Sequence, residues 1–324
     1  MRKIVRSFTI LMMAVAILSV IPTRSYSQSY PSKPITMIVP TPPGSLVDLL
    51  ARIISDNFTK AWGQKVIIRN VGGAGASIGA AKIAQAKGDG YTLGFVPANL
   101  STHPSLYNIS YNVLKDFTPI SQVAGASLVF YASNEIPAKT VKEAIALAKA
   151  SPGKLTYASA GKGSIAHLAG EMFKSMAGVD IVRVPYKKLN LGVLDVVKGR
   201  VSMVFVSAAQ GMPHVRAGKL KALGITSRIP NPGAPGVQPI STLGLPDYEI
   251  RSWFGVVGPA GIPDDIIKKI HAELVKMSQS SEFKAALAKP GLEPIINTPA
   301  QFLIALEQEI PKFAEIVKST KAKK

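Results

Sequence analysis

The fold is decided by Ile35-Thr36-Met37-Ile38-Val39, which runs through Pro40-Thr41-Pro42-Pro43-Gly44-Ser45 into Leu46–Ala61. The first five residues are apolar or β-branched on both faces, as a strand buried in a parallel sheet requires. The Pro- and Gly-rich link is typical of a tight turn in which Ser45 caps the following helix. The residues after it are apolar at helical spacing. A buried strand that turns directly into a helix is the repeating unit of an α/β fold.

The alternation of strand and helix continues along the chain. Strands are expected at 65–69, 92–96, 128–132, 155–159, 181–184, 202–206, 221–226, 253–257 and 294–296, and helices at 78–86, 141–150, 166–177, 193–198, 264–278, 281–287 and 299–317. Two stretches, Pro119–Ala126 and Arg228–Gly244, interrupt this rhythm, and the second, which is rich in Pro and Gly, is predicted to be an irregular connector. Repeated strand–helix units predict parallel-rich sheets flanked by helices.

The length of 324 residues suits about two domains. We place chain crossings near Val123 and near Arg251, so that residues 28–123 and 252–324 form the first domain and residues 124–251 the second. Two α/β domains joined by two crossings form a hinge with a cleft between them. The sequence therefore predicts a two-lobed α/β fold.

The N-terminus resembles an export signal. A basic head with Arg2, Lys3 and Arg6 precedes the apolar run Phe8–Ile21, and Ser25-Tyr26-Ser27 supplies the small residues of a cleavage site. The apolar run is shorter than the ~20 residues that a membrane-spanning helix needs. We expect residues 1–27 to be a cleaved signal peptide and the protein to lie in the periplasm. Because the chain has no cysteine, we expect neither a disulfide nor a lipid anchor.

The chain is strongly basic, with a formal net charge of +19. The lysines are scattered along predicted helices and are not interleaved with aromatic residues, so we expect no nucleic-acid partner. A basic surface attracts anionic solutes. The four histidines have no metal-ligand spacing and there is no cysteine, so we expect no metal and no cofactor.

Loops rich in Gly or Pro follow several of the predicted strands. Ligands in α/β sheets bind beyond the carboxyl ends of strands. The unpaired N–H groups at the start of a helix bind carboxylate or phosphate there, and glycine lets the backbone come close to a ligand. The candidate binding residues are Thr41, Pro42, Pro43, Gly44, Ser45, Gly73, Ala98, Asn99, Ala160, Gly161, Lys162, Gly163, Ser164, Tyr186, Lys187, Lys188, Val206 and Ser207.

Other chemistries fit these loops less well. The glycines at 73, 75 and 79 lack both the spacing of a dinucleotide loop and the acidic residue ~20 positions later. A hydrolase using Ser164 and His167 is an alternative, but no acid stands near His167 and no nucleophile elbow is present. A ligand sensor that feeds a signalling partner would use the same cleft, and it is a further alternative. We therefore expect a binding protein and not an enzyme.

The order of short motifs resembles the Bug-type solute receptors of tripartite tricarboxylate transporters. The resemblance runs from Tyr30 to nearly the end of the chain. It rests on Tyr30-Pro31-Ser32-Lys33-Pro34-Ile35, Val39-Pro40-x-Pro42-Pro43-Gly44, Asp48-x-x-Ala51-Arg52, Gly73-Ala74-Gly75, Asp89-Gly90-Tyr91-Thr92-Leu93, Pro104-Ser105-Leu106-Tyr107, Pro152-Gly153-Lys154-Leu155, His167-Leu168-Ala169-Gly170-Glu171, Val184-Pro185-Tyr186-Lys187, Ala217-Gly218-Lys219-Leu220 and Trp253-Phe254-Gly255. Each motif is weak alone, and their joint order is specific.

This resemblance implies a two-lobed periplasmic binding protein fold that captures a small carboxylate, often a di- or tricarboxylate or an aromatic acid. It implies that Pro42–Ser45 face the ligand from one domain. It also implies that Gly161, Gly163, Ser164, Tyr186 and Lys187 face the ligand from the other domain. The expected partners are the carboxylate and membrane transporter subunits, and we expect the receptor itself to be a monomer.

The chain departs from the family pattern at three places. Thr41 and Ser45 stand where Phe and Gly are common, Lys188 stands where Gly is common, and Val206 replaces an Asp that often follows Phe205. The loss of a carboxylate and the gain of an ammonium group disfavour a ligand that carries an amine. We therefore expect a purely anionic ligand.

Overall fold

One long strand, β4, takes part in two β-sheets in the computed structural model of the protein, which describes residues 30–321 except 162, 229 and 289. The predicted signal peptide lies outside the described residues. The compact unit that contains both sheets comprises residues 33–324. The strands are β1 (Ile35–Val39), β2 (Val66–Asn70), β3 (Thr92–Pro97), β4 (Phe117–Ser133), β5 (Thr156–Ser159), β6 (Val182–Pro185), β7 (Met203–Ser207), β8 (Leu220–Ile225), β9 (Arg251–Pro259) and β10 (Glu293–Pro294).

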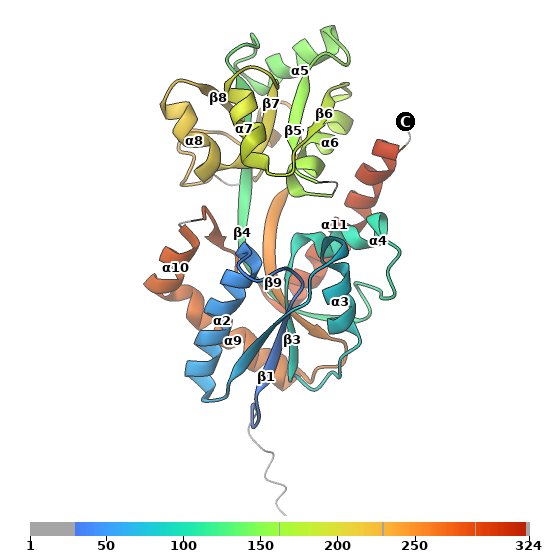
Figure 1. Cartoon of the computed structure of the whole chain (residues 1–324), viewed down its shortest axis with the longest axis vertical. Helices are drawn as coiled ribbons and strands as arrows, with labels where there is room; N and C mark the ends of the chain where they lie inside the picture. The colour runs from blue at the N-terminus through green and yellow to red at the C-terminus, as the bar shows by residue number, and fades with distance from the viewer. Residues whose placement is uncertain (1–29, 162, 229, 289, 322–324) are drawn as a thin grey trace, which may run out of the picture. The chain divides into compact units, whose positions relative to one another are not determined.

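Helices flank both sheets (Figure 1). They are α2 (Leu46–Trp62), α3 (Ser77–Ala84), α4 (His103–Leu106), α5 (Val141–Ala150), α6 (Ile165–Ala177), α7 (Leu189–Val197), α8 (Ala208–Arg216), α9 (Asp264–Gln279), α10 (Ser281–Ala288) and α11 (Pro299–Lys321), with the 3₁₀ helices η1 (Ala74–Ala76), η2 (Ala98–Thr102) and η3 (Ile240–Thr242). None of the helices in the part of the chain that the structure describes is long and apolar enough to cross a bilayer.

The first sheet has the order β2-β1-β3-β9-β4, and the second has the order β4-β7-β5-β6 with β8 on the other edge of β4. Strands β1, β2 and β3 are parallel, and so are β5, β6 and β7. The pairs that involve β4 or β9 are antiparallel. The predicted α/β fold with sheets flanked by helices is confirmed, and the sheets are mixed because the two central strands run against their neighbours.

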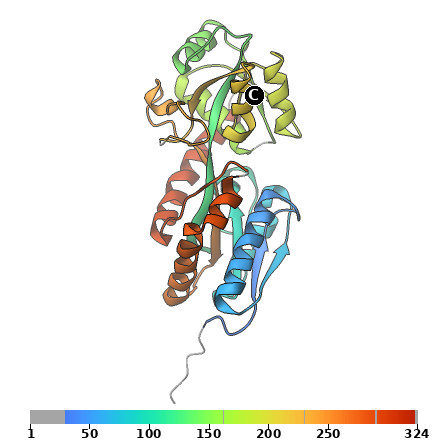
Figure 2. The same ribbon diagram turned by 90° about the vertical axis from the view of Figure 1, so that its left-hand side faces the viewer.

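Alternate residues of the strands face opposite helical layers, as the period of a strand requires. In the first sheet, Ile38 packs in a core with α3 and α11, while Met37 accepts a hydrogen bond from Ser55 on α2. Helices α2 and α9 contact each other (Figure 2). In the second sheet, Phe130 lies in a core with α5 and α6, and Val129 lies in a core with α7 and α8. Each sheet is therefore covered on both faces, which explains its continuous apolar strands.

Residues 119–126, which the sequence pattern does not assign to a strand or a helix, lie in a strand. This stretch is the first half of β4, which pairs along its length with β9. The pairing register shifts between Pro119 and Ser121 and again between Gln122 and Ala124. Such shifts let a strand accommodate a proline that cannot donate to the ladder. At Gly125 a Cβ atom would lie 2.6 Å from the Ser252 carbonyl oxygen, so the glycine permits a close approach of β9.

Strand β4 exchanges partners between Ser127, which pairs with Arg251 of β9, and Leu128, which pairs with Ser207 of β7. This exchange of partners lies a few residues after Val123, near which the sequence places the first crossing. We propose that these crossings divide the chain into a first lobe around the first sheet and a second lobe around the second sheet. Helix α11 contributes Phe302 and Leu306 to the first core and its later residues, beginning at Phe313, to the second.

Candidate functional site

A cavity of about 240 Å³ lies between elements of both sheets. The start of α6, η2, β9 and α11 all contribute to its lining. Its lining residues are Pro97, Ala98, Asn99, Thr102, Gly163, Ser164, Ile165, Leu168, Ser252, Phe254 and Phe313. Four of the predicted binding residues, Ala98, Asn99, Gly163 and Ser164, therefore meet at one cavity. Among the described residues, those that line the cavity are uncharged, so they offer a ligand neutral polar groups and main-chain dipoles.

The start of α6 is built to present N–H groups. Ser164 caps the helix, and its hydroxyl accepts a hydrogen bond from the main-chain N–H of His167 at 3.3 Å. The N–H groups of Ile165 and Ala166 have no acceptor within the helix because they belong to its first turn. Both Ser164 and Ile165 line the cavity. The positive end of the helix dipole adds to these donors, and the combination suits a carboxylate.

Gly163 contributes its shape to the site, and its N–H group is already used. Its φ of +81° is a conformation that favours glycine, and a Cβ atom there would lie 2.4 Å from Cδ1 of Leu106. The Gly163 N–H donates a hydrogen bond of 3.0 Å to Nδ1 of His167. The Ser164 N–H is also paired, because it donates to the Gly161 carbonyl oxygen at 3.0 Å. The N–H groups that can bind a ligand here are therefore those of the next two residues, Ile165 and Ala166.

The same hydrogen bonds bear on the hydrolase alternative. Nδ1 of His167 accepts a hydrogen bond from the Gly163 N–H, and the Ser164 hydroxyl accepts a hydrogen bond from the His167 N–H. A nucleophile needs its hydroxyl proton aimed at the imidazole base. The residues are close in space, but their mutual hydrogen bond is a helix cap.

The loop of residues 41–45 does not line this cavity. It is held internally by a 2.8 Å hydrogen bond between the hydroxyls of Thr41 and Ser45, and the Gly44 N–H donates to the Asp48 carboxylate at 2.8 Å. Pro42, Pro43 and Gly44 are exposed. The predicted free donor at Gly44 is thus paired within its own loop.

Asp48 is a structural residue that the sequence reading did not assign a role. Its buried carboxylate accepts hydrogen bonds from Gly44, from Arg52 at 3.0 Å and from Asn70 at 2.9 Å. Burial tends to raise the pKa of Asp48, but the hydrogen bonds from these groups outweigh it and lower the pKa. The spacing of four residues between Asp48 and Arg52 was the available signal.

The Gly73 loop lies beside the 41–45 loop. Asn70 donates to the Thr41 carbonyl at 3.1 Å, and a Cβ atom at Gly72 would touch Pro42 at 3.4 Å. Gly73 is exposed and does not line the cavity. These two loops form one surface of the first lobe at the carboxyl ends of β1 and β2.

The Tyr186 loop of the second lobe holds one group of candidates. The Tyr186 hydroxyl donates to Asp195 at 2.8 Å, and burial together with this hydrogen bond raises the pKa of Tyr186 to about 12. Lys187 and Lys188 are exposed. Lys162 lies outside the described residues.

Strand ends in the second lobe supply the other candidates. Ala160 is half-buried and Gly161 is exposed, and neither lines the cavity. Val206 is buried in the core against α7 and α8, so its side chain serves packing. Ser207 is half-buried and donates to Gln210 at 3.2 Å.

The apolar part of the cavity was not predicted. Phe254 follows Trp253 in a motif that the sequence does show, and Phe313 comes from a helix more than fifty residues later. Helical spacing marks Phe313 as buried but cannot tell which core it joins. Thr102 belongs to η2, a short element without a periodic signal.

Comparison with known proteins settles the family. A model of the tripartite tricarboxylate transporter family receptor matches residues 50–321. The chain belongs to this receptor family. It is therefore a solute-binding receptor of the TctC/Bug kind, which confirms the non-enzymatic interpretation.

Relatives of this TctC/Bug receptor include proteins with known ligands. Protein BugT of Bordetella pertussis is 34% identical over 303 residues, covering 92% of each chain. A protein of R. palustris solved with adipate is 29% identical, with a TM-score of 0.70 over 89% of this chain and 97% of that chain. MatC of Rhodopseudomonas palustris with bound malate is 26% identical, with a TM-score of 0.68 over 89% and 100% of the two chains.

Proposed function

We propose that this receptor captures a small carboxylate in the cavity between the start of α6 and η2, and delivers it in the periplasm to the membrane subunits of a tripartite transporter. The main support for this proposal is the start of α6. Its residues Ser164 and Ile165 line the same cavity as Asn99 and Thr102 of the first lobe. The two solved relatives hold adipate and malate, which are small carboxylates.

The ligand class is a carboxylate without an amine. No lining residue of the cavity carries a carboxylate that could pair with an ammonium group, and burying an unpaired charge is costly. A ligand such as an amino acid would therefore leave its ammonium group unpaired.

A calorimetric titration of the purified protein with adipate, malate and glutamate tests this proposal. We expect one molecule of adipate or malate to bind per chain and glutamate to bind at least about 10-fold more weakly, a difference of about 1.4 kcal/mol. A thermal shift gives an independent readout, since ligand at 100 times its Kd adds about 2.7 kcal/mol of stability. Tight binding of glutamate, with no binding of adipate or malate, would contradict the proposal.

Two capping variants test the position of the site. Ser164→Ala removes the cap of α6 at the cavity, and Thr140→Ala removes the equivalent cap of α5, where Thr140 accepts from the Glu143 N–H at 3.1 Å. Each should cost about 1 kcal/mol of stability. Only Ser164→Ala should weaken carboxylate binding, and equal affinities in both variants would place the ligand elsewhere.

A further inference from the structure

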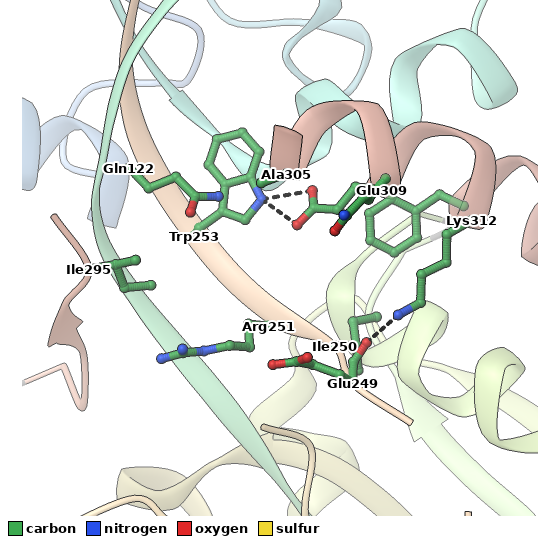
Figure 3. Close-up of a pocket in the computed structure, with 11 residues that line it drawn as sticks. Gln122, Glu249, Ile250, Arg251, Trp253, Ile295, Ala305, Glu309 and Lys312 are labelled. Carbon is green, nitrogen blue, oxygen red and sulfur yellow. Dashed lines mark hydrogen bonds between the residues drawn. The ribbon is translucent and has the colours of Figure 1, made fainter. Parts of the chain in front are cut away.

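The carboxylate of Glu309, on α11, joins three elements that are distant in sequence. It accepts a hydrogen bond of 2.7 Å from the Ser101 hydroxyl of η2. It also accepts from the indole N–H of Trp253 on β9, at 3.1 and 2.9 Å to its two oxygens. Figure 3 shows the Trp253 and Glu309 side chains turned toward each other at the edge of a second cavity of about 190 Å³.

Each partner of Glu309 is a direct neighbour of residues that line the ligand cavity. Ser101 precedes Thr102, and Trp253 stands between Ser252 and Phe254. One turn after Glu309 on the same helix, Phe313 lines the same cavity. One carboxylate thus ties together three elements, η2, β9 and α11, that line the cavity together with the start of α6.

We propose that Glu309 is a positioning residue for ligand binding, holding η2, β9 and α11 in register so that Asn99 and Thr102 face the start of α6. This inference rests on the proposed function, because it assigns a purpose to one wall of the same cavity. Glu309 itself does not line that cavity, so it acts through its neighbours.

Glu309 is held mainly by hydrogen bonds from Trp253 and Ser101, and Lys312 donates its hydrogen bond elsewhere. Burial raises the pKa of Glu309, while the hydrogen bonds from Trp253 and Ser101 and the charge of Lys312 oppose that rise. The Lys312 ammonium group donates to the Glu249 carbonyl oxygen at 2.6 Å (Figure 3). Truncating the half-buried Glu309 side chain would leave the N–H of buried Trp253 and the hydroxyl of buried Ser101 without their acceptor, which is costly for buried donors.

Hydrogen–deuterium exchange without ligand tests the positioning directly. Glu309→Leu should raise exchange in residues 98–102 on the order of 10-fold, at a temperature where urea melts show every variant folded. Glu309→Gln should raise it much less, because its amide can accept from the indole and donate to Ser101. Glu307→Gln, on the exposed face of α11, is the control and should leave exchange unchanged.

The affinity of the same variants for adipate supplies the second readout. Glu309→Leu should weaken adipate binding about 10-fold, Glu309→Gln should restore most of the affinity, and Ser101→Ala should add nothing further in the Glu309→Leu background. Unchanged exchange at residues 98–102 would overturn the inference, as would altered exchange with unchanged affinity. Absence of carboxylate binding by the wild type would instead refute the proposed function, and the exchange measurement would still decide what Glu309 holds.

Discussion

His103 shows how one buried side chain supports the glycine-rich loop that follows β2. Its Nδ1 is 2.6 Å from the Tyr111 hydroxyl, and its Nε2 is 2.9 Å from the Gly75 carbonyl oxygen. The carbonyl can only accept, so Nε2 donates and a neutral ring accepts at Nδ1 from Tyr111. The imidazole therefore anchors the glycine loop that follows β2.

Stability should depend on pH through this residue. Burial lowers the pKa of His103 below its ordinary value of 6.5, and the hydrogen bond to Gly75 only partly opposes this. As the pH falls below 6.5, the unfolded chain takes up the proton first, so the free energy of unfolding falls. Urea melts between pH 7.5 and 5 should show this fall, and His103→Gln should make it shallower. An identical slope in the variant would show that His103 does not contribute.

The roles of individual residues were only partly predictable. Ser164 was expected at the ligand site because it follows a glycine-rich strand end and opens a predicted helix, and it lines the cavity. Gly44 was expected to offer a free N–H, but Asp48 occupies it. Val206 was assigned to the site from its place after Phe205, and its side chain packs inward. A sequence pattern can identify an N–H donor such as that of Gly44, but it cannot show whether a neighbouring side chain already accepts its hydrogen bond.

At the scale of elements, the loop before α6 depends on two glycines with different requirements. Gly163 has a φ of +81° and is crowded by Leu106, whereas a Cβ atom at Gly161 would meet nothing within 4 Å. The two positions are therefore a matched pair for testing how much the shape of this loop matters.

Alanine at each position should separate backbone strain from the mere effect of an added methyl group. Gly163→Ala should lose about 1–3 kcal/mol of stability and weaken carboxylate binding, because an L-residue is strained at positive φ. Gly161→Ala should stay within about 0.5 kcal/mol of the wild type. Urea unfolding and calorimetry measure both effects. Equal losses in the two variants would show that the loop conformation is not the critical feature.

Most helices and strands were predictable because their apolar patterns have a clear period. β1 and α5 begin and end where the sequence predicts. The first half of β4 was missed because Pro119 and Gly125 suggest a loop, whereas pairing with β9 overrides that local preference. η2 and α4 were missed because such short elements carry no periodic pattern. Both elements contact the ligand cavity or its surroundings, so the least predictable segments are those that shape the site.

At the scale of the whole molecule, the ordered motifs predicted the family, and the family match confirmed it. Which loops share a cavity was not predictable, because that depends on how elements of the two sheets meet. The structure brings the start of α6 together with η2, β9 and α11, while the 41–45 and 73 loops form a separate surface. The central claim is therefore that the first turn of α6 holds the carboxylate of the ligand.

A crystal structure of the protein with adipate or malate, whichever binds more tightly, tests this claim most directly. The account predicts a ligand carboxylate within hydrogen-bonding distance of the Ile165 and Ala166 N–H groups, with Asn99 on the opposite side. A ligand bound without contact to the start of α6, for example in the cavity beside Gln122 and Glu309, would contradict it.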